Sequence, residues 1–250
     1  MNPKVTILGV GPGDPELLTM KAMKRLEDCN LVLYTGSLIS EEVKDLFKGK
    51  ESFDTSSMTM EEIIQKVKEG VSDGKRICIA HDGDPSIYGA ISEEIALLGK
   101  EGIEAEIVPG VSSFQLSASL LGMELTCPGG PQSIIITRLP QRTKYERKMI
   151  VERNSTMVIF LSIHLVRQVQ EELLRVFPPD FPAAVVYRAG WKDQLVLKGR
   201  ISDLEDLVRN YKITKTALII VSECLRYNGH ERSDLYFPGF THSFRKGRSP

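Results

Sequence analysis

The sequence is poor in several features that mark particular classes of protein. Its 250 residues include only four cysteines and one tryptophan, and the formal net charge at pH 7 is −1. A chain this close to neutral has no global basic field that would attract nucleic acid or an anionic membrane. No apolar run approaches the roughly 20 residues that cross a bilayer, and Met1–Lys4 leads into a strand pattern without a signal-peptide core. We therefore expect a cytoplasmic protein without nucleic-acid or membrane partners.

The patterns of common metal and nucleophile sites are also missing. The cysteines form no metal-ligand pair, and we expect each to be a small buried apolar residue in a reducing setting: Cys29, Cys78, Cys127 and Cys224. The four histidines form no HExxH pattern, and neither a GxSxG elbow nor a GxxxxGK[ST] loop is present. The sequence therefore predicts no protein-bound metal, and the catalytic residue stays unassigned.

The chain is organised around the stretch Gly9–Thr19, which reads GVGPGDPELLT. A strand pattern from Val5 to Val10 leads into three glycines at alternate positions. Asp14 and Pro15 then suit the N-cap and the first position of a helix. Glycines between a strand and a helix let the backbone approach a small ligand closely. The stretch is therefore a candidate binding loop.

Three details argue against a dinucleotide as its ligand. Pro12 removes a backbone donor, and Asp14 places a carboxylate at the helix N-terminus, where a pyrophosphate would bind. The next strand pattern, Leu31–Tyr34, is followed by Thr35–Ser37, without the acidic residue that binds the ribose in dinucleotide folds. The loop is expected to accept a nucleoside-like ligand that is not an anion.

Strand and helix patterns alternate through the first half of the chain. In chain order they fall at 5–10, 17–28, 31–34, 41–48, 60–71, 76–81, 92–102, 104–108 and from 112 to 121. This alternation predicts a mostly parallel sheet with helices on both faces. Such sheets bind ligands beyond the carboxyl ends of their strands, so the loops at 9–14, 82–88 and 109–113 are expected to form one site.

The second half begins at a compositional break, Cys127–Pro131, which predicts an N-terminal α/β domain over 1–126 and a C-terminal α/β domain over 132–250. Strand patterns now outnumber helix patterns, which favours a mixed sheet. The strands are expected at 133–138, 156–161, 183–187, 194–199 and 217–221, and the helices at 143–152, 164–176 and 201–210.

Basic residues concentrate early in this second half: Arg138, Arg142, Lys144, Arg147 and Lys148. Such a run is typical of a solvated helix face. It also suits a cluster that pairs with a polycarboxylate substrate, and the spacing does not separate the two interpretations.

A second acidic loop, DGDPSIYG at 82–89, follows a strand as the first loop does. Alone it would indicate a turn and a helix cap. Two acidic loops in one parallel sheet repel phosphates and suit ribose hydroxyls, amines and a sulfonium cation, which favours S-adenosylmethionine (SAM) over NAD or ATP. The turn at 108–113, VPGVSS, is a third wall of the same predicted pocket.

The chain resembles the tetrapyrrole (corrin/porphyrin) methylases, which are SAM-dependent. The resemblance covers nearly the whole chain and rests on GVGPGDPELLT (9–19), DGDPSIYG (82–89), VPGVSSF (108–114), TMVIFLS (156–162), AAVVYRAGW (183–191) and TALIIVSE (216–223). Within the family, YTGSLI at 34–39 and the aromatic and basic stretch at 235–245 resemble the enzymes that methylate C-11 of precorrin-4 or cobalt-precorrin-4 in cobalamin synthesis.

The resemblance implies two α/β domains, a SAM cleft between them and a homodimer that acts on a tetrapyrrole. It places contacts to SAM at Pro12, Asp82, Gly83, Asp84, Ile87, Ser112, Ser113, Leu161, Ala189 and Ala217. Relatives that methylate uroporphyrinogen often carry an acidic residue just after the second strand. Tyr34–Ser37 carries none, which argues against uroporphyrinogen as the substrate.

Other functions stay open at the level of the sequence. One is a sister methylase that acts at another ring position, on precorrin-3B at C-17 or on uroporphyrinogen III, or the related diphthine synthase. Another is a non-catalytic protein that binds SAM or a tetrapyrrole. A nucleotide-dependent dehydrogenase is disfavoured by Asp14 and by the missing ribose acid. Any cobalt would arrive with the substrate, and the sequence shows no set of metal ligands that would indicate whether the substrate already carries it.

Overall fold

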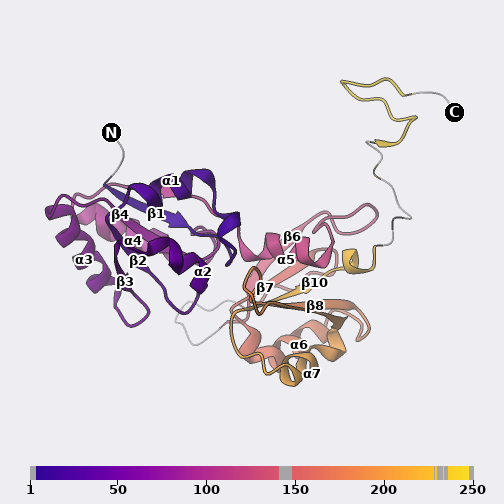
Figure 1. Ribbon diagram of the computed structural model, residues 1–250. Coiled ribbons are helices and arrows are strands. Elements are labelled where there is room, and N and C mark those ends of the chain that lie inside the picture. Colours follow the sequence, from indigo (N-terminus) through magenta and orange to yellow (C-terminus); the bar gives the residue numbers. More distant parts are fainter. Residues whose placement is uncertain (1–3, 141–147, 228, 230–232, 234–235, 248–250) are drawn as a thin grey trace. The chain divides into compact units, whose positions relative to one another are not determined.

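The computed structural model describes residues 4–140, 148–227, 229, 233 and 236–247 (Figure 1). The chain divides into two compact units, each with one five-stranded sheet. The first unit comprises Met1–Ser117 together with Arg188–Gln194, and the second comprises Ala118–Tyr187 and Leu195–Pro250. The turn Arg188–Gln194 joins two strands of the second sheet, yet it packs as part of the first unit.

The sheet of the first unit is entirely parallel, with the strand order β3-β2-β4-β1-β5. Its strands are β1 (Val5–Gly9), β2 (Leu31–Tyr34), β3 (Glu51–Asp54), β4 (Ile77–His81) and β5 (Ala105–Val108). The central strands are apolar along nearly their whole length: all of β1 is buried, and so is β4 except for His81. Continuous burial of this kind is typical of parallel strands covered on both faces.

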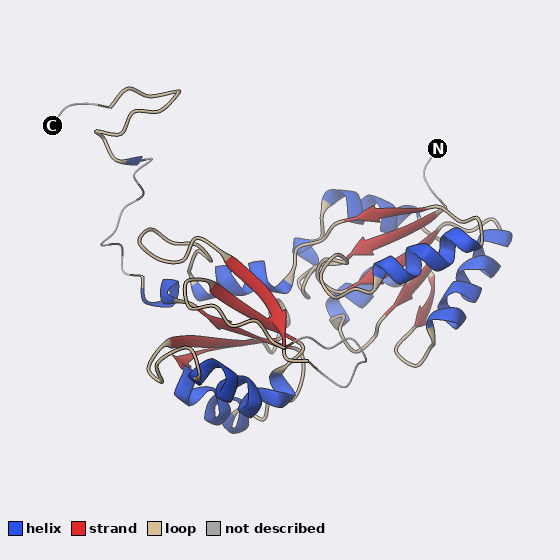
Figure 2. Ribbon diagram, turned by 180° about the vertical axis from the view of Figure 1, so that it is seen from behind, coloured by secondary structure: helices blue, strands red, loops and turns tan. Residues whose placement is uncertain are grey.

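Helices lie on both sides of this sheet (Figure 2). They are α1 (Met20–Asp28), α2 (Glu41–Lys44), α3 (Met60–Ser72) and α4 (Ile91–Lys100). The next helix, α5 (Ser113–Leu121), begins in the first unit and ends in the second. Successive side chains of a strand point to opposite faces, so Leu8 packs in the apolar cluster that includes Leu26 of α1. Ile7 packs in the other cluster, with Val67 of α3 and Leu98 of α4. The predicted parallel sheet with helices on both faces is confirmed.

The helices begin where the sequence offers caps. The Thr59 side chain accepts the Glu62 N–H at 3.3 Å, and the Glu62 carboxylate accepts the Thr59 N–H at 2.7 Å, which is the reciprocal capping box. The helix predicted over 17–28 differs in detail. A short 3₁₀ helix, Pro15–Leu17, follows Asp14, and α1 starts afresh because Thr19 caps it through the Ala22 N–H at 3.1 Å.

An ion-paired carboxylate fastens α1 to the edge strand β5. Glu106 Oε2 lies 2.5 Å from Arg25 Nε, and Glu106 Oε1 lies 2.6 Å from Lys21 Nζ. Hydrogen bonds from Arg25 and Lys21 lower the pKa of the Glu106 carboxyl to about 2. The charged form is therefore stabilised in the folded protein relative to the unfolded chain.

Replacing Glu106 with glutamine is expected to lower the free energy of unfolding at pH 7 by about 1 kcal/mol, the range of ion pairs that solvent reaches. The folded-state pKa is depressed, so the contribution is present above the unfolded pKa of about 4.3 and is lost as the pH falls towards 2. Urea titrations of the wild type and of Glu106→Gln from pH 7 to pH 2 measure this. A difference in unfolding free energy between the wild type and Glu106→Gln that stays the same from pH 7 to pH 2 would contradict this prediction.

The sheet of the second unit is mixed, with the strand order β6-β7-β10-β8-β9. Its strands are β6 (Ile134–Arg138), β7 (Thr156–Phe160), β8 (Pro182–Tyr187), β9 (Leu195–Arg200) and β10 (Ala217–Val221). β6 and β7 are parallel, whereas β10 is antiparallel to β7 and β8, and β9 is antiparallel to β8. The mixed C-terminal sheet that the sequence predicted is therefore confirmed.

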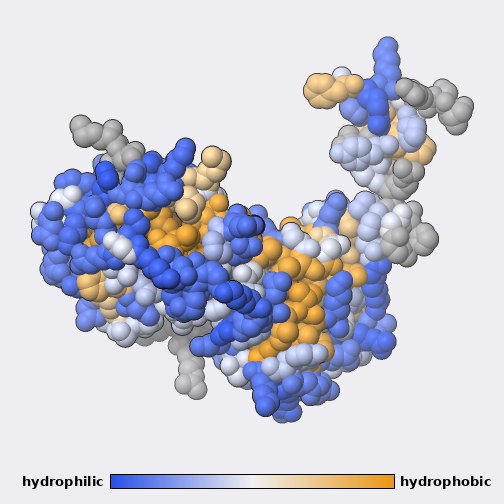
Figure 3. Space-filling view, in the orientation of Figure 1, coloured by the Kyte–Doolittle hydropathy of each residue, from blue (hydrophilic) through white to orange (hydrophobic). Residues whose placement is uncertain are grey.

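One face of the second sheet carries its main apolar core. Helices α6 (Val166–Leu174) and α7 (Leu204–Asn210) contribute Val169 and Leu204, which pack with the strand residues Met157 and Ile219. Short 3₁₀ helices at Ile163–Leu165, Ile201–Asp203 and Glu223–Arg226 flank these elements. Figure 3 shows hydrophilic residues over much of each unit and a hydrophobic patch on each, the larger one on the second unit. Among the described residues, no helix has the length and apolarity that crossing a membrane requires.

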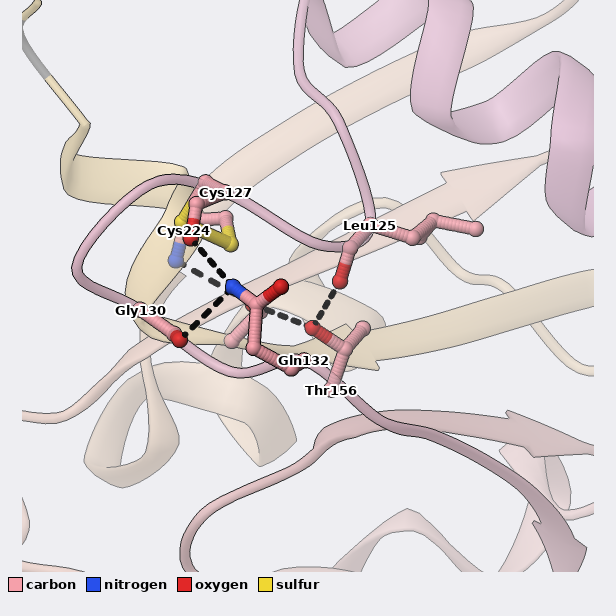
Figure 4. The surroundings of a disulfide bond; sticks show 7 residues. Leu125, Cys127, Gly130, Gln132, Thr156 and Cys224 are labelled. Atoms are coloured by element: carbon pink, nitrogen blue, oxygen red, sulfur yellow. Dashed lines mark hydrogen bonds between the residues drawn. A yellow bond between two sulfur atoms is a disulfide. The ribbon is translucent and has the colours of Figure 1, made fainter. Parts of the chain in front are cut away.

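Two cysteines differ from the expectation of four separate buried residues in a reducing setting. Cys127 and Cys224, 97 residues apart, form a disulfide between the segment before β6 and the 3₁₀ helix after β10. Beside it, the Gln132 side chain donates to the Cys127 and Gly130 carbonyls at 2.9 and 3.2 Å (Figure 4). The spacing gave no hint of this pair because the fold alone brings the two segments together. Cys29 and Cys78 are buried free thiols, as expected.

Two further differences concern predicted elements. β3 was not predicted, because Glu51–Asp54 is an edge strand with a single apolar residue, Phe53. The helix expected at 143–152 lies partly outside the described residues. The basic cluster has only Arg138, at the end of β6, and Lys148 inside them.

Candidate functional site

The three predicted loops meet at one edge of the first sheet. Because β4, β1 and β5 are parallel neighbours, their carboxyl ends lie side by side. The loops that follow them begin at Val10, Asp82 and Pro109. Val10 N–H donates to the His81 carbonyl at 2.9 Å, so the first loop continues the sheet for one more residue. The three loops therefore lie side by side at one rim, as the topology predicted. That this rim is a binding site stays a prediction.

Glycine is required where the loops cross. Gly11 and Gly83 exchange backbone hydrogen bonds, with Gly11 N–H on the Gly83 carbonyl at 3.2 Å and Gly83 N–H on the Gly11 carbonyl at 2.8 Å. A Cβ on Gly9 would lie 2.5 Å from the Gly83 oxygen and 2.7 Å from Gly110 N. A Cβ on Gly110 would overlap the same Gly83 oxygen. The rim is thus backbone packed on backbone, as close approach without side chains allows.

Asp84 ties two of these loops together. Its Oδ2 accepts the Gly110 N–H at 2.9 Å, and its Oδ1 accepts the Ser86 N–H at 2.8 Å and the Ser86 hydroxyl. Desolvation acts against the charge, but the hydrogen bonds from Ser86 and Gly110 outweigh it and lower the pKa of the Asp84 carboxyl. The carboxylate is therefore ionised at neutral pH and holds the loop after β4 to the loop after β5.

The other predicted contacts of these loops differ in exposure. Asp82 is exposed at the rim, and desolvation by the surrounding protein atoms raises its pKa. Ile87 and Ser113 are half-buried, and Ser112 is buried, with its N–H on the Gln115 side chain at 2.9 Å. Asp82 is thus exposed as a residue, although the protein atoms around its carboxyl disfavour the charged form.

The glycine loop is pinned through its carbonyl groups. Ser40 Oγ donates to the Gly13 carbonyl at 2.5 Å, and Trp191 Nε1 donates to the Pro12 carbonyl at 3.2 Å. Asp14 Oδ1 accepts the Glu16 N–H at 2.9 Å, which confirms the predicted N-cap. Neither Ser40 nor Trp191 was predicted from the sequence. Trp191 lies 179 positions from Pro12, and no local pattern could reveal the pair.

The remaining predicted contacts divide between the units. Ala189 lies in the turn that packs with the first unit, which therefore holds eight of the ten predicted residues. Leu161 and Ala217 belong to the second unit, where Leu161 follows β7 and Ala217 begins β10 opposite Tyr187 of β8. Leu161 and Thr216 have left-handed φ angles of 51° and 54°, as do four other non-glycine residues among those described. Such conformations are costly for residues with side chains.

A carboxylate missing after β2 is supplied by β3. Asp54 ends β3, and its Oδ1 accepts the Gly36 N–H of the neighbouring turn at 2.9 Å. Hydrogen bonds from Ser56 and Gly36 lower the pKa of the Asp54 carboxyl, so the group is a weak base. No acidic residue follows β2 in the sequence. Asp54 lies next to the turn after β2 because β3, which the sequence did not predict, pairs with β2.

The histidine at the end of β4 is engaged in the protein. His81 Nε2 lies 3.1 Å from Oε2 of Glu94, which is buried in α4. Among the described residues, no group of three or more histidine, cysteine, aspartate or glutamate side chains is arranged to hold a metal ion.

Comparison with known proteins decides the family. Residues 4–205 match the family model described as tetrapyrrole (corrin/porphyrin) methylases. The chain belongs to this family. The family match includes the whole first sheet and four of the five strands of the second, and every predicted contact residue except Ala217, which begins β10.

Individual relatives show which enzymes of the family the chain is similar to. The chain is 41% identical over 251 residues to the cobalt-precorrin-4 C(11)-methyltransferase of Methanocaldococcus jannaschii, covering 98% of this chain and 97% of that one. It superposes with a TM-score of 0.81 and 35% identity on a solved cobalt precorrin-4 methyltransferase, a cobalamin biosynthetic enzyme, over 88% and 95% of the two chains. A uroporphyrin-III C-methyltransferase from Thermus thermophilus, solved with S-adenosylhomocysteine, matches with a TM-score of 0.72 and 27% identity over 89% and 93%.

Proposed function

We propose that this protein is a SAM-dependent methyltransferase that methylates C-11 of cobalt-precorrin-4. The observation that carries the proposal is the similarity along almost the whole chain to an enzyme of that name, at 41% identity. The loop chemistry agrees with it, because the rim is acidic and built of close-packed backbone, with Asp82 and Asp84 at the end of β4.

The residues of the rim fit SAM better than a phosphate-bearing coenzyme. The exposed Asp82 suits ribose hydroxyls or the amino group of the methionine part, and Ile87 offers an apolar contact. The backbone crossing leaves no room for a side chain at Gly9 or at Gly110, because a Cβ on either would overlap the Gly83 carbonyl oxygen. A pyrophosphate would meet the carboxylate of Asp14 at the start of the Pro15–Leu17 helix.

The protein's part in the reaction is orientation. SAM supplies the methyl group, and an electron-rich carbon of the macrocycle takes it by in-line displacement. Holding the two in a near-attack geometry is worth about 7–11 kcal/mol. Methyl transfer cancels the sulfonium charge, so an anion against the sulfur would stabilise the ground state and slow the step. We therefore expect Asp84 to hold the loops through Ser86 and Gly110 and to stay clear of the sulfur.

The reaction itself tests the proposal. We expect methyl-labelled SAM to transfer one methyl group to cobalt-precorrin-4, with NMR of the product locating it at C-11. Parallel incubations with cobalt-free precorrin-4, precorrin-3B and uroporphyrinogen III decide the substrate. Faster transfer to precorrin-4 would reassign the enzyme to the cobalt-free substrate. Transfer to another ring position would make it a sister methylase, and SAM binding without transfer to any of them would make it a binding protein.

We also propose that the protein works as a cytoplasmic homodimer. The resemblance to the family supports the dimer, and the free thiols of Cys29 and Cys78 suit a reducing compartment. The Cys127–Cys224 disulfide is the feature that fits a reducing compartment least well. Sedimentation measurements, with and without reductant, test the oligomeric state.

A further inference from the structure

We propose that Trp191 is a positioning residue for the methyl donor, whose indole holds the glycine loop in the shape that accepts SAM. This inference rests on the proposed function and concerns the same rim. Trp191 is the single tryptophan of the chain. It stands in the turn Arg188–Gln194, between β8 and β9, which packs with the first unit and not with its own sheet.

The indole contacts the loop at two successive residues. Its Nε1 donates to the Pro12 carbonyl at 3.2 Å. A Cβ on Gly13 would lie 2.7 Å from the same nitrogen, so the ring lies directly against the Gly13 backbone. Gly13 has a φ of 147°, a conformation that side chains disfavour. The fit therefore needs both the glycine and the aromatic ring.

The hydrogen bond sets the direction of a peptide group. A trans peptide carries its carbonyl and its N–H on opposite sides, so holding the Pro12 carbonyl against Trp191 directs the Gly13 N–H away from the indole. Ser40 holds the next carbonyl, that of Gly13, at 2.5 Å. Two consecutive peptide groups of the binding loop are thus oriented by side chains that come from far along the chain.

The turn that carries Trp191 is itself held firmly. The Arg188 guanidinium lies 4.8 Å from the centroid of the indole ring, and Arg188 Nη1 lies 2.5 Å from Asp193 Oδ2. The Gly190 N–H donates to the Gln194 side chain at 3.0 Å. Such contacts keep the indole in one orientation, because they fix the backbone on both sides of it. A preorganised support costs the loop little ordering entropy when a ligand binds.

Two variants separate the hydrogen bond from the ring. Trp191→Phe keeps an aromatic ring and loses the N–H, and Trp191→Ala loses both. Tyr211→Ala is the matched control, because Tyr211 is an exposed aromatic residue after α7 in the second unit. SAM affinity is measured by calorimetry. The methyl-transfer assay gives kcat and the KM values for SAM and for the tetrapyrrole, and thermal unfolding gives the melting temperature.

For Trp191→Phe we expect the SAM dissociation constant to rise about tenfold, the upper range for one lost hydrogen bond. For Trp191→Ala we expect a rise of roughly 100-fold, because the ring contact with Gly13 is lost as well. The KM for SAM should follow these values, while kcat at saturating SAM and the KM for the tetrapyrrole stay within about twofold. Tyr211→Ala should change none of them.

The single tryptophan also gives a direct readout. SAM binding to the wild type should change the indole emission, with the same dissociation constant as calorimetry. A lowered melting temperature with unchanged SAM affinity in both variants would overturn the proposal and leave Trp191 a structural residue. A rise in the tetrapyrrole KM alone would also overturn it. Wild-type protein that binds no SAM would refute the proposed function itself, so the two failures are distinct.

Discussion

Replacing Gly110 with alanine is expected to abolish measurable SAM binding and to lower the free energy of unfolding by about 3 kcal/mol, the upper range for overpacking. The new methyl group would overlap the Gly83 carbonyl oxygen and would lie 2.9 Å from Gly9 Cα. All of these atoms are backbone, so no side chain can turn aside to relieve the overlap. The loops after β1, β4 and β5 would have to separate.

The same substitution in open space is the control. Gly99 lies in α4, and a Cβ built there meets nothing within 4 Å. Gly99→Ala should therefore leave SAM affinity unchanged and should raise stability by roughly 0.5–1 kcal/mol, because alanine is the better helix former. Denaturant unfolding and calorimetric titration of the two variants measure both quantities. Normal SAM affinity in Gly110→Ala would show that the backbone crossing is not part of the site.

Elements with strong local signals are predictable from this sequence. β1 is apolar except for Thr6, and the sequence at the start of α3 shows the capping-box residues Thr59 and Glu62. Parallel order then follows from the alternation of strands and helices. β3 is the counterexample: with only Phe53 apolar, its pairing with β2 is decided by the sheet and not by its own composition. The same reasoning explains why Asp54 was missed as a neighbour of Gly36.

The candidate site is predictable to the extent that topology alone places it. Once β4, β1 and β5 are parallel neighbours, the loops after them must share an edge. Contacts that depend on how distant segments fold together carry no such signal. Trp191 meets Pro12 from a turn of the other sheet, and Cys127 meets Cys224 across 97 residues. Those pairs form only in the tertiary structure, so no local sequence pattern predicts them.

Asp84 has a structural role beside the predicted contact to SAM, which stays a prediction. The resemblance names it as a contact to SAM. In the structure, both carboxylate oxygens accept hydrogen bonds from the protein itself, from Ser86 and from Gly110. Asp82, two residues earlier, is the exposed carboxylate of the loop. We infer that Asp84 shapes the rim, and that Asp82 is the better candidate for direct contact with the ligand.

Asp84→Ala is therefore expected to weaken SAM binding by at least about 30-fold and to lower the free energy of unfolding by about 3 kcal/mol. Two charge-assisted backbone hydrogen bonds are lost, and their donors remain near the rim. The pKa of Asp84 is depressed in the folded protein. Its contribution is then complete above the unfolded pKa of about 3.9 and is lost as the pH falls below it. The stability difference between wild type and variant should shrink at acid pH.

Asp82→Ala is the variant to compare with Asp84→Ala. The two residues lie in one loop, but the Asp84 carboxylate accepts hydrogen bonds from the protein and Asp82 is exposed. For Asp82→Ala we expect a rise in the SAM dissociation constant of about tenfold, consistent with the loss of one hydrogen bond to a charged group. Its melting temperature should stay near that of the wild type, since the exposed carboxylate holds no loop in place. Calorimetry and thermal unfolding of both variants distinguish the roles. Equal losses of affinity with equal losses of stability would place both carboxylates in the scaffold and leave SAM to be held by other groups.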